Sequence, residues 1–178
     1  MSTDRMEPDQ ADNLRTVQFA SGNLLHLVND VLDYSKLQEG ALQIESIPFD
    51  AERTMRNVVR SQENAALGGD VKLVGTWEGG DATWVLGDPV RFAQIVTNLV
   101  SNGIKFSPRG KVEVRCGRND GFLRISVSDN GTGIPPERQK LVFKPFEQAD
   151  ASTSRQFGGT GLGLAIVEKI VQISGGEP

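Results

Sequence analysis

The sequence has little of several residue types, and each shortage excludes a class of protein. A single cysteine among 178 residues, Cys116, excludes an internal disulfide and favours a reducing compartment. No apolar run approaches the roughly 20 residues of a membrane-spanning helix, and no signal peptide opens the chain. The net charge of -4 provides no basic surface for nucleic acid or anionic lipid. We therefore expect a cytoplasmic globular protein, or the cytosolic part of a larger one, that contacts neither nucleic acid nor a membrane directly.

Hydrophobic periodicity predicts helices and strands mixed in one domain behind a helical arm. Residues from Leu14 to Ser35 recur in steps of three and four, a heptad seam typical of a bundle or coiled-coil helix, and Gly40 suits its end. Asp50 and the pair Asp88–Pro89 are helix-start signals. Residues 1–11 are polar and expected to fray. The expected helices span about 14–40, 50–67, 88–106 and 164 onward, and the expected strands lie near 42–44, 71–77, 82–87, 111–116 and 122–128.

The stretch SDNGTGIPPE places an acidic residue and two glycines at the end of a predicted strand. Asp129 continues the apolar face of that strand, so its carboxylate is expected to point inward, where it needs hydrogen-bond donors. Gly131 and Gly133 can bring bare backbone close to whatever supplies them. A heterocycle that bears an amino group would fit, and an aspartate that caps its own turn would explain the same residues.

Polar side chains form a stripe along the helix that begins after Asp88. Asn98, Asn102 and Lys105 follow one another at i, i+4 and i+7, so they stack on one face. Amide oxygens ligate Mg²⁺ and lysine pairs with phosphate, so the stripe suits a cation bound to phosphate oxygens. A solvated helix face would give the same pattern.

The segment FGGTGLGL sets four glycines just before the last predicted helix. Backbone N–H groups at a helix start, with the helix dipole behind them, bind anions. The segment is not a P-loop, because no Lys-Ser/Thr pair follows the glycines. A flexible loop, or a hinge for a lid formed by the polar residues 135–157, would also use these glycines. Together the three motifs predict a site for a purine triphosphate with Mg²⁺.

In order and spacing these motifs resemble the N, G1, F and G2 boxes of the ATP-binding domain of sensor histidine kinases. The matching stretches are NLVSNGIKFSPRG, DNGTGI, FKPF and GGTGLGL. The run KPFEQADASTSRQFGGTGLGL resembles hybrid histidine kinases, which carry a receiver domain, and SGNLLHLVNDVLDYSKLQEG resembles the second helix of the family's dimerisation hairpin. The resemblance covers about residues 14–176.

The resemblance implies a fold and a division of the chain. The fold would be an α/β sandwich in which a mixed sheet packs against helices, as in histidine kinases and Hsp90-type ATPases, preceded by a long N-terminal helix. The implied parts are a flexible N-terminus over 1–11, the hairpin helix over 12–40 and the ATP-binding domain over 41–178.

The resemblance also implies roles for individual residues. Asp129 would accept a hydrogen bond from the adenine amino group, and Lys105 would contact phosphate. Asn102 would ligate Mg²⁺ with Asn98 assisting, and Asn98 and Lys105 are the catalytic candidates. The other residues implied at the site or its lid are Gly131, Gly133, Ile134, Phe143, Phe146, Arg155, Gly159, Thr160, Gly161, Leu162 and Gly163.

The implied reaction is transfer of the γ-phosphate of Mg²⁺-ATP to a histidine in two-component signalling. Related ATPases have a water-activating glutamate where this chain has Asn98, and an amide cannot act as a general base, so hydrolysis is disfavoured. The family's acceptor motif, H-E-x-R-T-P, is missing. The single histidine, His26, lies opposite the heptad seam, no acidic residue follows it directly, and no proline lies five positions on. The expected partners are therefore a histidine-bearing dimerisation helix and a receiver domain or response regulator, with homodimerisation through the arm as a further expectation.

Two alternatives stay open at this point. The family continues past SGGEP with a further strand pair, so the sequence is expected to be a fragment cut at both ends or a naturally reduced member. The missing acceptor and the missing strands would also suit a non-catalytic nucleotide-binding or dimerisation module.

Overall fold

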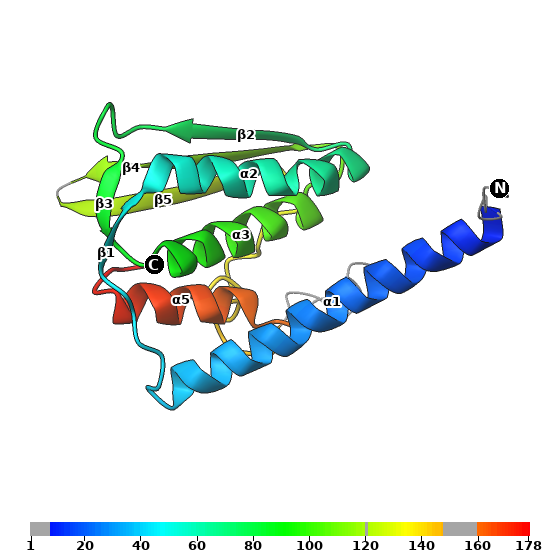
Figure 1. The fold of residues 1–178 in the computed structure, drawn as a ribbon, viewed down its shortest axis with the longest axis horizontal. Helices are drawn as coiled ribbons and strands as arrows, with labels where there is room; N and C mark the ends of the chain where they lie inside the picture. The colour runs from blue at the N-terminus through cyan, green and yellow to red at the C-terminus, as the bar shows by residue number, and fades with distance from the viewer. Residues whose placement is uncertain (1–7, 120, 148–159) are drawn as a thin grey trace, which may run out of the picture.

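A long helix followed by an α/β unit makes up the fold (Figure 1). This computed structural model describes residues 8–119, 121–147 and 160–178. The mixed sheet packed against helices confirms the predicted fold class. The helices are α1 (Pro8–Gln38), α2 (Ala51–Gly68), α3 (Pro89–Phe106) and α5 (Gly163–Ile173), and the strands are β1 (Ile47–Asp50), β2 (Lys72–Trp77), β3 (Trp84–Gly87), β4 (Lys111–Asn119) and β5 (Phe122–Asp129).

β4 is the central strand of a three-stranded mixed sheet. It pairs in parallel with β2 and antiparallel with β5, in the order β2-β4-β5. β1 and β3 pair antiparallel as a separate two-stranded sheet. β2 and β3 are neighbours in sequence, yet they belong to different sheets, because each pairs with a strand more distant along the chain.

α2 and α3 cover one face of the three-stranded sheet, and α5 packs beside α3 (Figure 1). Both predicted aspartate caps are confirmed. Asp50 Oδ1 accepts a hydrogen bond from the backbone N–H of Arg53 at 2.9 Å. Asp88 Oδ1 accepts from the backbone N–H groups of Val90 and Arg91, at 2.9 and 3.0 Å. The two helices thus begin where the sequence predicts.

The main core lies between the sheet and these helices. Val114 and Cys116 of β4 are fully buried in one cluster with Met55 of α2 and with Val96 and Val100 of α3. Burial, with a smaller contribution from the charge of Glu78, raises the pKa of the Cys116 thiol to about 12. The cysteine is therefore an un-ionised core side chain.

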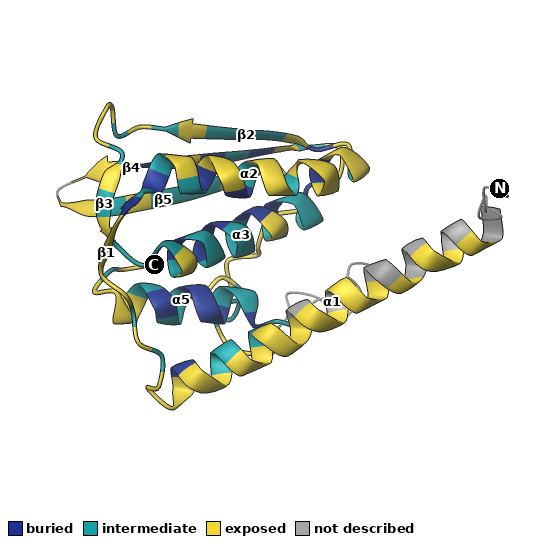
Figure 2. Ribbon diagram, viewed as in Figure 1, coloured by how far each residue is buried: buried dark blue, intermediate teal, exposed yellow. Residues whose placement is uncertain are grey.

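A second core cluster joins α1 to the rest of the molecule. Leu37, near the end of α1, is buried with Ile95 of α3 and with Ile166 and Ile170 of α5. Figure 2 shows most described residues of α1 as exposed. Among the described side chains of α1, those that tertiary packing covers lie along its last turns.

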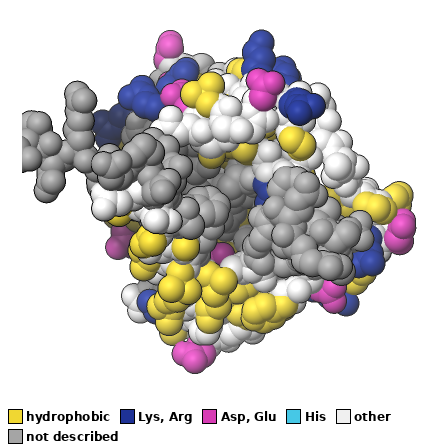
Figure 3. Space-filling view, turned by 90° about the vertical axis from the view of Figure 1, so that its right-hand side faces the viewer, with side chains coloured by type: hydrophobic (Ala, Val, Ile, Leu, Met, Phe, Trp, Pro, Cys, Tyr) yellow, Lys and Arg dark blue, Asp and Glu magenta, His cyan; other side chains and the backbone are white. Residues whose placement is uncertain are grey.

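The predicted heptad seam lies on the exposed part of α1. Leu24 and Leu25 are 62% and 64% exposed, and Leu32 is 52% exposed. Hydrophobic side chains gather on the lower part of the surface in the view of Figure 3. None of the helices in the described ranges combines the length and apolarity that crossing a membrane would require.

Two predicted boundaries are wrong. α1 begins at Pro8 and not at Leu14, because proline suits the first helical turn, where its missing N–H has no intrahelical partner to lose. Residues 41–46 form no strand, and β1 begins at Ile47. Leu42 and Ile44 instead pack against the cluster around α5. Their alternating pattern reflects this one-sided burial and not pairing in a sheet.

Candidate functional site

The polar stripe of α3 is held in place by the core behind it. Asn98, Asn102 and Lys105 lie along one side of the helix, and each is half-buried. Val96 and Val100 on the opposite side are fully buried against the sheet. The stripe is therefore a fixed, half-buried row of side chains and not a fully solvated face.

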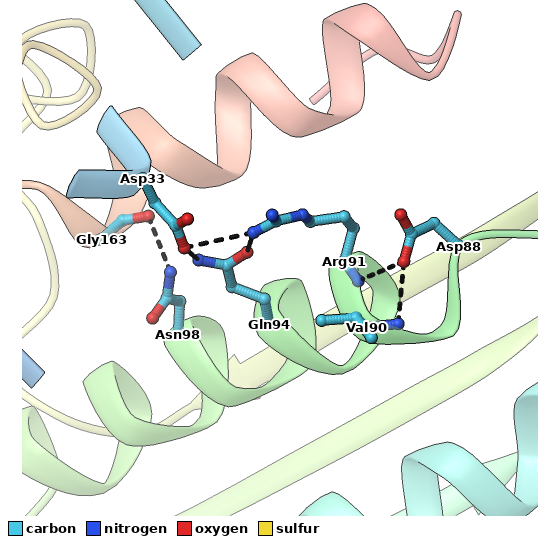
Figure 4. A network of polar contacts seen from close by, with 7 residues as sticks. All are labelled: Asp33, Asp88, Val90, Arg91, Gln94, Asn98 and Gly163. Atoms are coloured by element: carbon cyan, nitrogen blue, oxygen red, sulfur yellow. Dashed lines mark hydrogen bonds and ion pairs between the residues drawn. The ribbon is translucent and has the colours of Figure 1, made fainter. Parts of the chain in front are cut away.

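Asn98 connects α3 to the start of α5. Its Nδ2 donates a hydrogen bond to the carbonyl of Gly163, the first residue of α5, at 3.2 Å (Figure 4). Because the nitrogen is engaged, Oδ1 remains as an acceptor or cation ligand. Asn102 lies one turn further along, and its side chain makes no hydrogen bond within the described ranges. Both amide oxygens therefore suit a bound cation.

Lys105 lies at the far end of the stripe. Partial burial lowers the pKa of its ammonium group below the ordinary value. Its Nζ lies 4.9 Å from the centroid of the Phe106 ring. A partly desolvated ammonium gains more from an anionic partner than a solvated one does, so Lys105 is suited to a phosphate.

Asp129 is held at one oxygen by two donors. Oδ1 accepts from the hydroxyl of Ser107 and from the backbone N–H of Gly131, each at 2.9 Å. Within the described part of the chain, Oδ2 accepts no hydrogen bond, so the carboxylate combines the predicted turn cap with an acceptor for a ligand. The residue is exposed and does not point into the core as predicted, because β5 ends there at the rim of the sheet.

Ser107 was not among the predicted site residues. It is only 1% exposed and directly follows α3. The sequence predicts Ser107 and Pro108 only as the end of the helix. Nothing local signals the contact with Asp129, which lies 22 positions away.

Gly131 and Gly133 are glycines for different reasons. A Cβ on Gly131 would lie 2.1 Å from the carbonyl oxygen of Phe106, so the loop could not approach the end of α3 with any other residue. The next N–H, that of Thr132, donates to the same carbonyl at 3.2 Å. Gly133 has a φ of +70° and open space around it. The bare backbone of Gly131 thus serves the contact with α3, which the sequence did not predict.

The described end of the glycine-rich segment folds back on itself before α5. The backbone N–H of Leu162 donates to Thr160 Oγ1 at 3.0 Å, and the Leu162 side chain is fully buried. Gly163 contacts Asn98, so the end of this segment lies against the stripe. Gly159 and Arg155 lie outside the described residues.

Phe146 packs against both the glycine-rich segment and α1. Its N–H donates to the carbonyl of Gly161 at 3.0 Å, and a Cβ on Gly161 would lie 2.9 Å from the Phe146 carbonyl carbon. Its ring meets the Tyr34 ring edge-on, with centroids 6.2 Å apart. Phe143 is half-buried nearby in sequence, and Ile134 is 43% exposed in the loop after Asp129.

α1 contributes two aspartates that the sequence did not signal. Thr160 Oγ1 donates to Asp30 Oδ2 at 3.1 Å. Asp33 Oδ2 accepts from Gln94 Nε2 at 2.7 Å and from Arg91 Nη1 at 3.2 Å (Figure 4). The partners are 58 to 130 positions apart, so no local motif could reveal them.

The described residues hold no group of three or more His, Cys, Asp and Glu side chains that could bind a metal ion. A cation at this site would therefore rely on amide oxygens and on the ligand's own oxygens. His26 lies on α1, and its side chain is outside the described residues.

Comparison with known proteins agrees with this geometry. The family model for histidine kinase-, DNA gyrase B- and HSP90-like ATPases matches residues 87–178. The signal transduction histidine-protein kinase BarA of Escherichia coli (strain K12) is 41% identical over 177 residues, which are 97% of this chain and 19% of that protein. The hybrid signal transduction histidine kinase A of Dictyostelium discoideum is 36% identical over 94% of this chain and 8% of that protein. The chain thus spans less than a fifth of the length of these relatives.

A solved structure shows the same arrangement of elements. The crystal structure of full-length ShkA in complex with AMPPNP superposes with a TM-score of 0.78 at 30% identity, covering 96% of this chain and 35% of that chain. The family match includes all of α3, β4, β5 and α5, and with them the whole polar stripe, Asp129 and the glycine-rich segment. This chain therefore belongs to the histidine kinase-, DNA gyrase B- and HSP90-like ATPase family, and it is homologous to hybrid sensor histidine kinases.

Proposed function

We propose that this chain binds Mg²⁺-ATP along α3 and donates the γ-phosphate to a histidine that lies outside it. The observation that supports this most directly is the fixed stripe on α3, which ends at Asp129 on one side and meets the start of α5 on the other. Ser107 and Asn98, which make those two contacts, are nine residues apart, roughly 14 Å along a helix. An extended nucleoside triphosphate fits such a row.

The adenine end of the site consists of Asp129, Ser107 and Gly131. Oδ1 of Asp129 is fixed by two donors, and Oδ2 would accept the N–H of the adenine amino group. A carboxylate fixed in this way loses little conformational freedom when the base binds. Gly133 and Ile134, in the following loop, would line the same end.

The phosphate end consists of the stripe on α3 together with residues 160–163. Asn102 and Asn98 would hold Mg²⁺ through their amide oxygens, because Mg²⁺ commonly takes one or two protein ligands plus substrate phosphate oxygens and water. When bound, the ion would neutralise phosphate charge. Lys105 would pair with a phosphate oxygen, and the first N–H groups of α5 would face the anion. Gly159 and Arg155 remain predicted contacts of this end.

Transfer is favoured over hydrolysis because the site offers no general base at Asn98. The residues of this chain would therefore bind, orient and neutralise the triphosphate, and the acceptor would bring its own nucleophile. The names of the relatives support a histidine as this acceptor.

The wider setting belongs to the same proposal. α1 would be the second helix of a dimerisation hairpin, within a division into residues 1–11, 12–40 and 41–178. The partners would be a helix that bears the acceptor histidine, a receiver domain or response regulator, and a second copy of the chain. The expected location is the cytoplasm, where ATP is available.

Calorimetric titration with a non-hydrolysable ATP analogue tests the binding step. We expect binding that depends on Mg²⁺ in the wild type and is lost in Asp129→Ala. Glu63→Ala, an equal loss of charge at an exposed position on α2, is the matched control and should bind as the wild type does. A folded wild-type chain that binds no analogue would contradict the proposal.

A second candidate is a non-catalytic nucleotide-binding module that contacts a partner through α1. The exposed apolar side chains of α1 favour a partner at that helix. The two candidates differ in one measurement, the appearance of labelled phosphate from γ-labelled ATP on a supplied histidine-bearing helix. Analogue binding without any labelling of that helix would favour the second candidate.

A further inference from the structure

A polar contact links α1 directly to the described end of the glycine-rich segment. The hydroxyl of Thr160 donates to Asp30 Oδ2 at 3.1 Å and accepts from the backbone N–H of Leu162 at 3.0 Å. The three groups thus form a hydrogen-bonded chain that runs from the start of α5 through Thr160 to a carboxylate of α1. Asp30 lies 130 positions from Thr160, so the contact exists only while α1 is seated in this position.

Three more residues of α1 seat the helix beside this contact. Asp33 accepts hydrogen bonds from two side chains of α3 (Figure 4), Tyr34 packs edge-on against Phe146, and Leu37 is buried in the cluster around α5. Together with Asp30 they follow at i, i+3, i+4 and i+7, so they lie on one face of α1. This seating face is distinct from the heptad seam, whose apolar side chains are exposed.

This hydrogen-bonded chain weakens the binding of a triphosphate in two ways. It occupies the N–H of Leu162 and the Thr160 hydroxyl, which are donors at the phosphate end of the proposed site. It also places a carboxylate beside the start of α5, where the triphosphate would bring its own negative charge. Like charges brought together in a partly desolvated site repel each other.

We propose that seated α1 lowers the affinity of this chain for ATP, through the contact of Asp30 with Thr160. The inference rests on the proposed nucleotide site and adds a regulatory contact to it. Coupling between two binding events is reciprocal, so a bound triphosphate must in turn weaken the seating of α1.

Titration of Asp30→Asn with AMPPNP and Mg²⁺ tests the proposal. Asparagine keeps the size of the side chain and an acceptor oxygen, and removes only the charge. We expect affinity to rise about three- to tenfold, as for removal of one like charge from a partly solvated site. Glu39→Gln removes the same charge at an exposed position just after α1 and should change the affinity less than about twofold.

Amide hydrogen exchange on the wild-type chain provides a second readout. AMPPNP should speed exchange over residues 30–37 of α1, which no purely structural role of Asp30 would produce.

Unchanged or weaker binding by Asp30→Asn, or increased protection of residues 30–37, would overturn the inference while leaving the proposed function intact. If neither wild type nor Asp30→Asn binds AMPPNP, the proposed function fails and the inference fails with it. Binding by Asp30→Asn alone would support both.

Discussion

The two ends of the proposed ATP site are built from contacts of very different range. At the adenine end, Asp129 is held by Gly131 two positions away and by Ser107 at a separation of 22. At the phosphate end, Asn98 and Gly163 are 65 positions apart, and the contact of Thr160 with α1 spans 130. The adenine end is thus part of the rim of the core, whereas the phosphate end is assembled from separate elements. Long-range contacts of this kind can open without global unfolding, so the phosphate end is where regulation can act.

The largest expected effect tests whether the adenine end is as rigid as this comparison implies. Gly131→Ala would place a Cβ 2.1 Å from the Phe106 carbonyl oxygen, so the loop must move away from α3. We expect a loss of about 2–3 kcal/mol in the free energy of unfolding, measured by urea denaturation, and loss of AMPPNP binding. Gly133→Ala is the control, because its site is open and only the positive φ is costly, about 1 kcal/mol. An equal loss of unfolding free energy in the two variants would mean that the loop adjusts easily to the added Cβ. The adenine end would then not be the rigid end of the site.

A smaller effect is expected when one donor at the adenine end is removed. Ser107→Ala leaves Asp129 Oδ1 with one donor and lets the carboxylate rotate. We expect AMPPNP to bind roughly tenfold more weakly, a loss of about 1.4 kcal/mol, which is typical of a hydrogen bond to a charged group. Ser101→Ala removes a hydroxyl that bonds only within α3, to the carbonyl of Asn98, and should leave affinity nearly unchanged. If Ser107→Ala bound AMPPNP with wild-type affinity, the hydrogen bond from Ser107 would not be needed to orient the Asp129 carboxylate for binding.

Nucleotide binding should respond differently when the long-range contacts of the phosphate end are cut. Asp33→Ala removes the acceptor that ties α1 to Arg91 and Gln94. We expect the free energy of unfolding to fall by about 1 kcal/mol, because this ion pair is largely but not fully shielded from solvent. Nucleotide affinity should not fall with it. Glu52→Ala, which breaks the more exposed pair with Arg56 on α2, should cost less, about 0.3–0.5 kcal/mol. Weaker AMPPNP binding by Asp33→Ala would contradict the view that the long-range contacts of the phosphate end can open without loss of the site.

The same difference in range explains what the sequence could reveal. The caps at Asp50 and Asp88 and the face of α3 are local properties, and each could be predicted from spacing. The alternation in β5 predicted the partly buried side chains of Leu123, Ile125 and Val127 but wrongly placed Asp129 in the core. The motif order also identified the family, because each of the N, G1 and G2 boxes is a short continuous stretch of the sequence. The contacts of Ser107, Asp30 and Asp33 depend on how elements pack, and no local spacing encodes them.

Alternation of apolar residues also misled the prediction where packing decided the outcome. Leu42 and Ile44 alternate as in a strand, yet they cover the cluster around α5. The local pattern shows which side chains are buried but not which element buries them.

The smallest expected effect tests whether the core behind the polar stripe of α3 stays closed. Burial raises the pKa of the Cys116 thiol to about 12, so as pH rises the thiol ionises first in the unfolded chain, near its ordinary pKa of about 9. The free energy of unfolding should therefore fall as the pH rises above about 8, by about 0.8 kcal/mol in total at pH 9.5, through this group alone. Urea denaturation of the wild type and of Cys116→Ala between pH 7.5 and 9.5 isolates it, because the alanine variant lacks only this contribution to the slope. Parallel slopes would mean that the folded chain admits the thiolate, so that β4 opens to water and the core that holds the polar stripe of α3 in place is not closed.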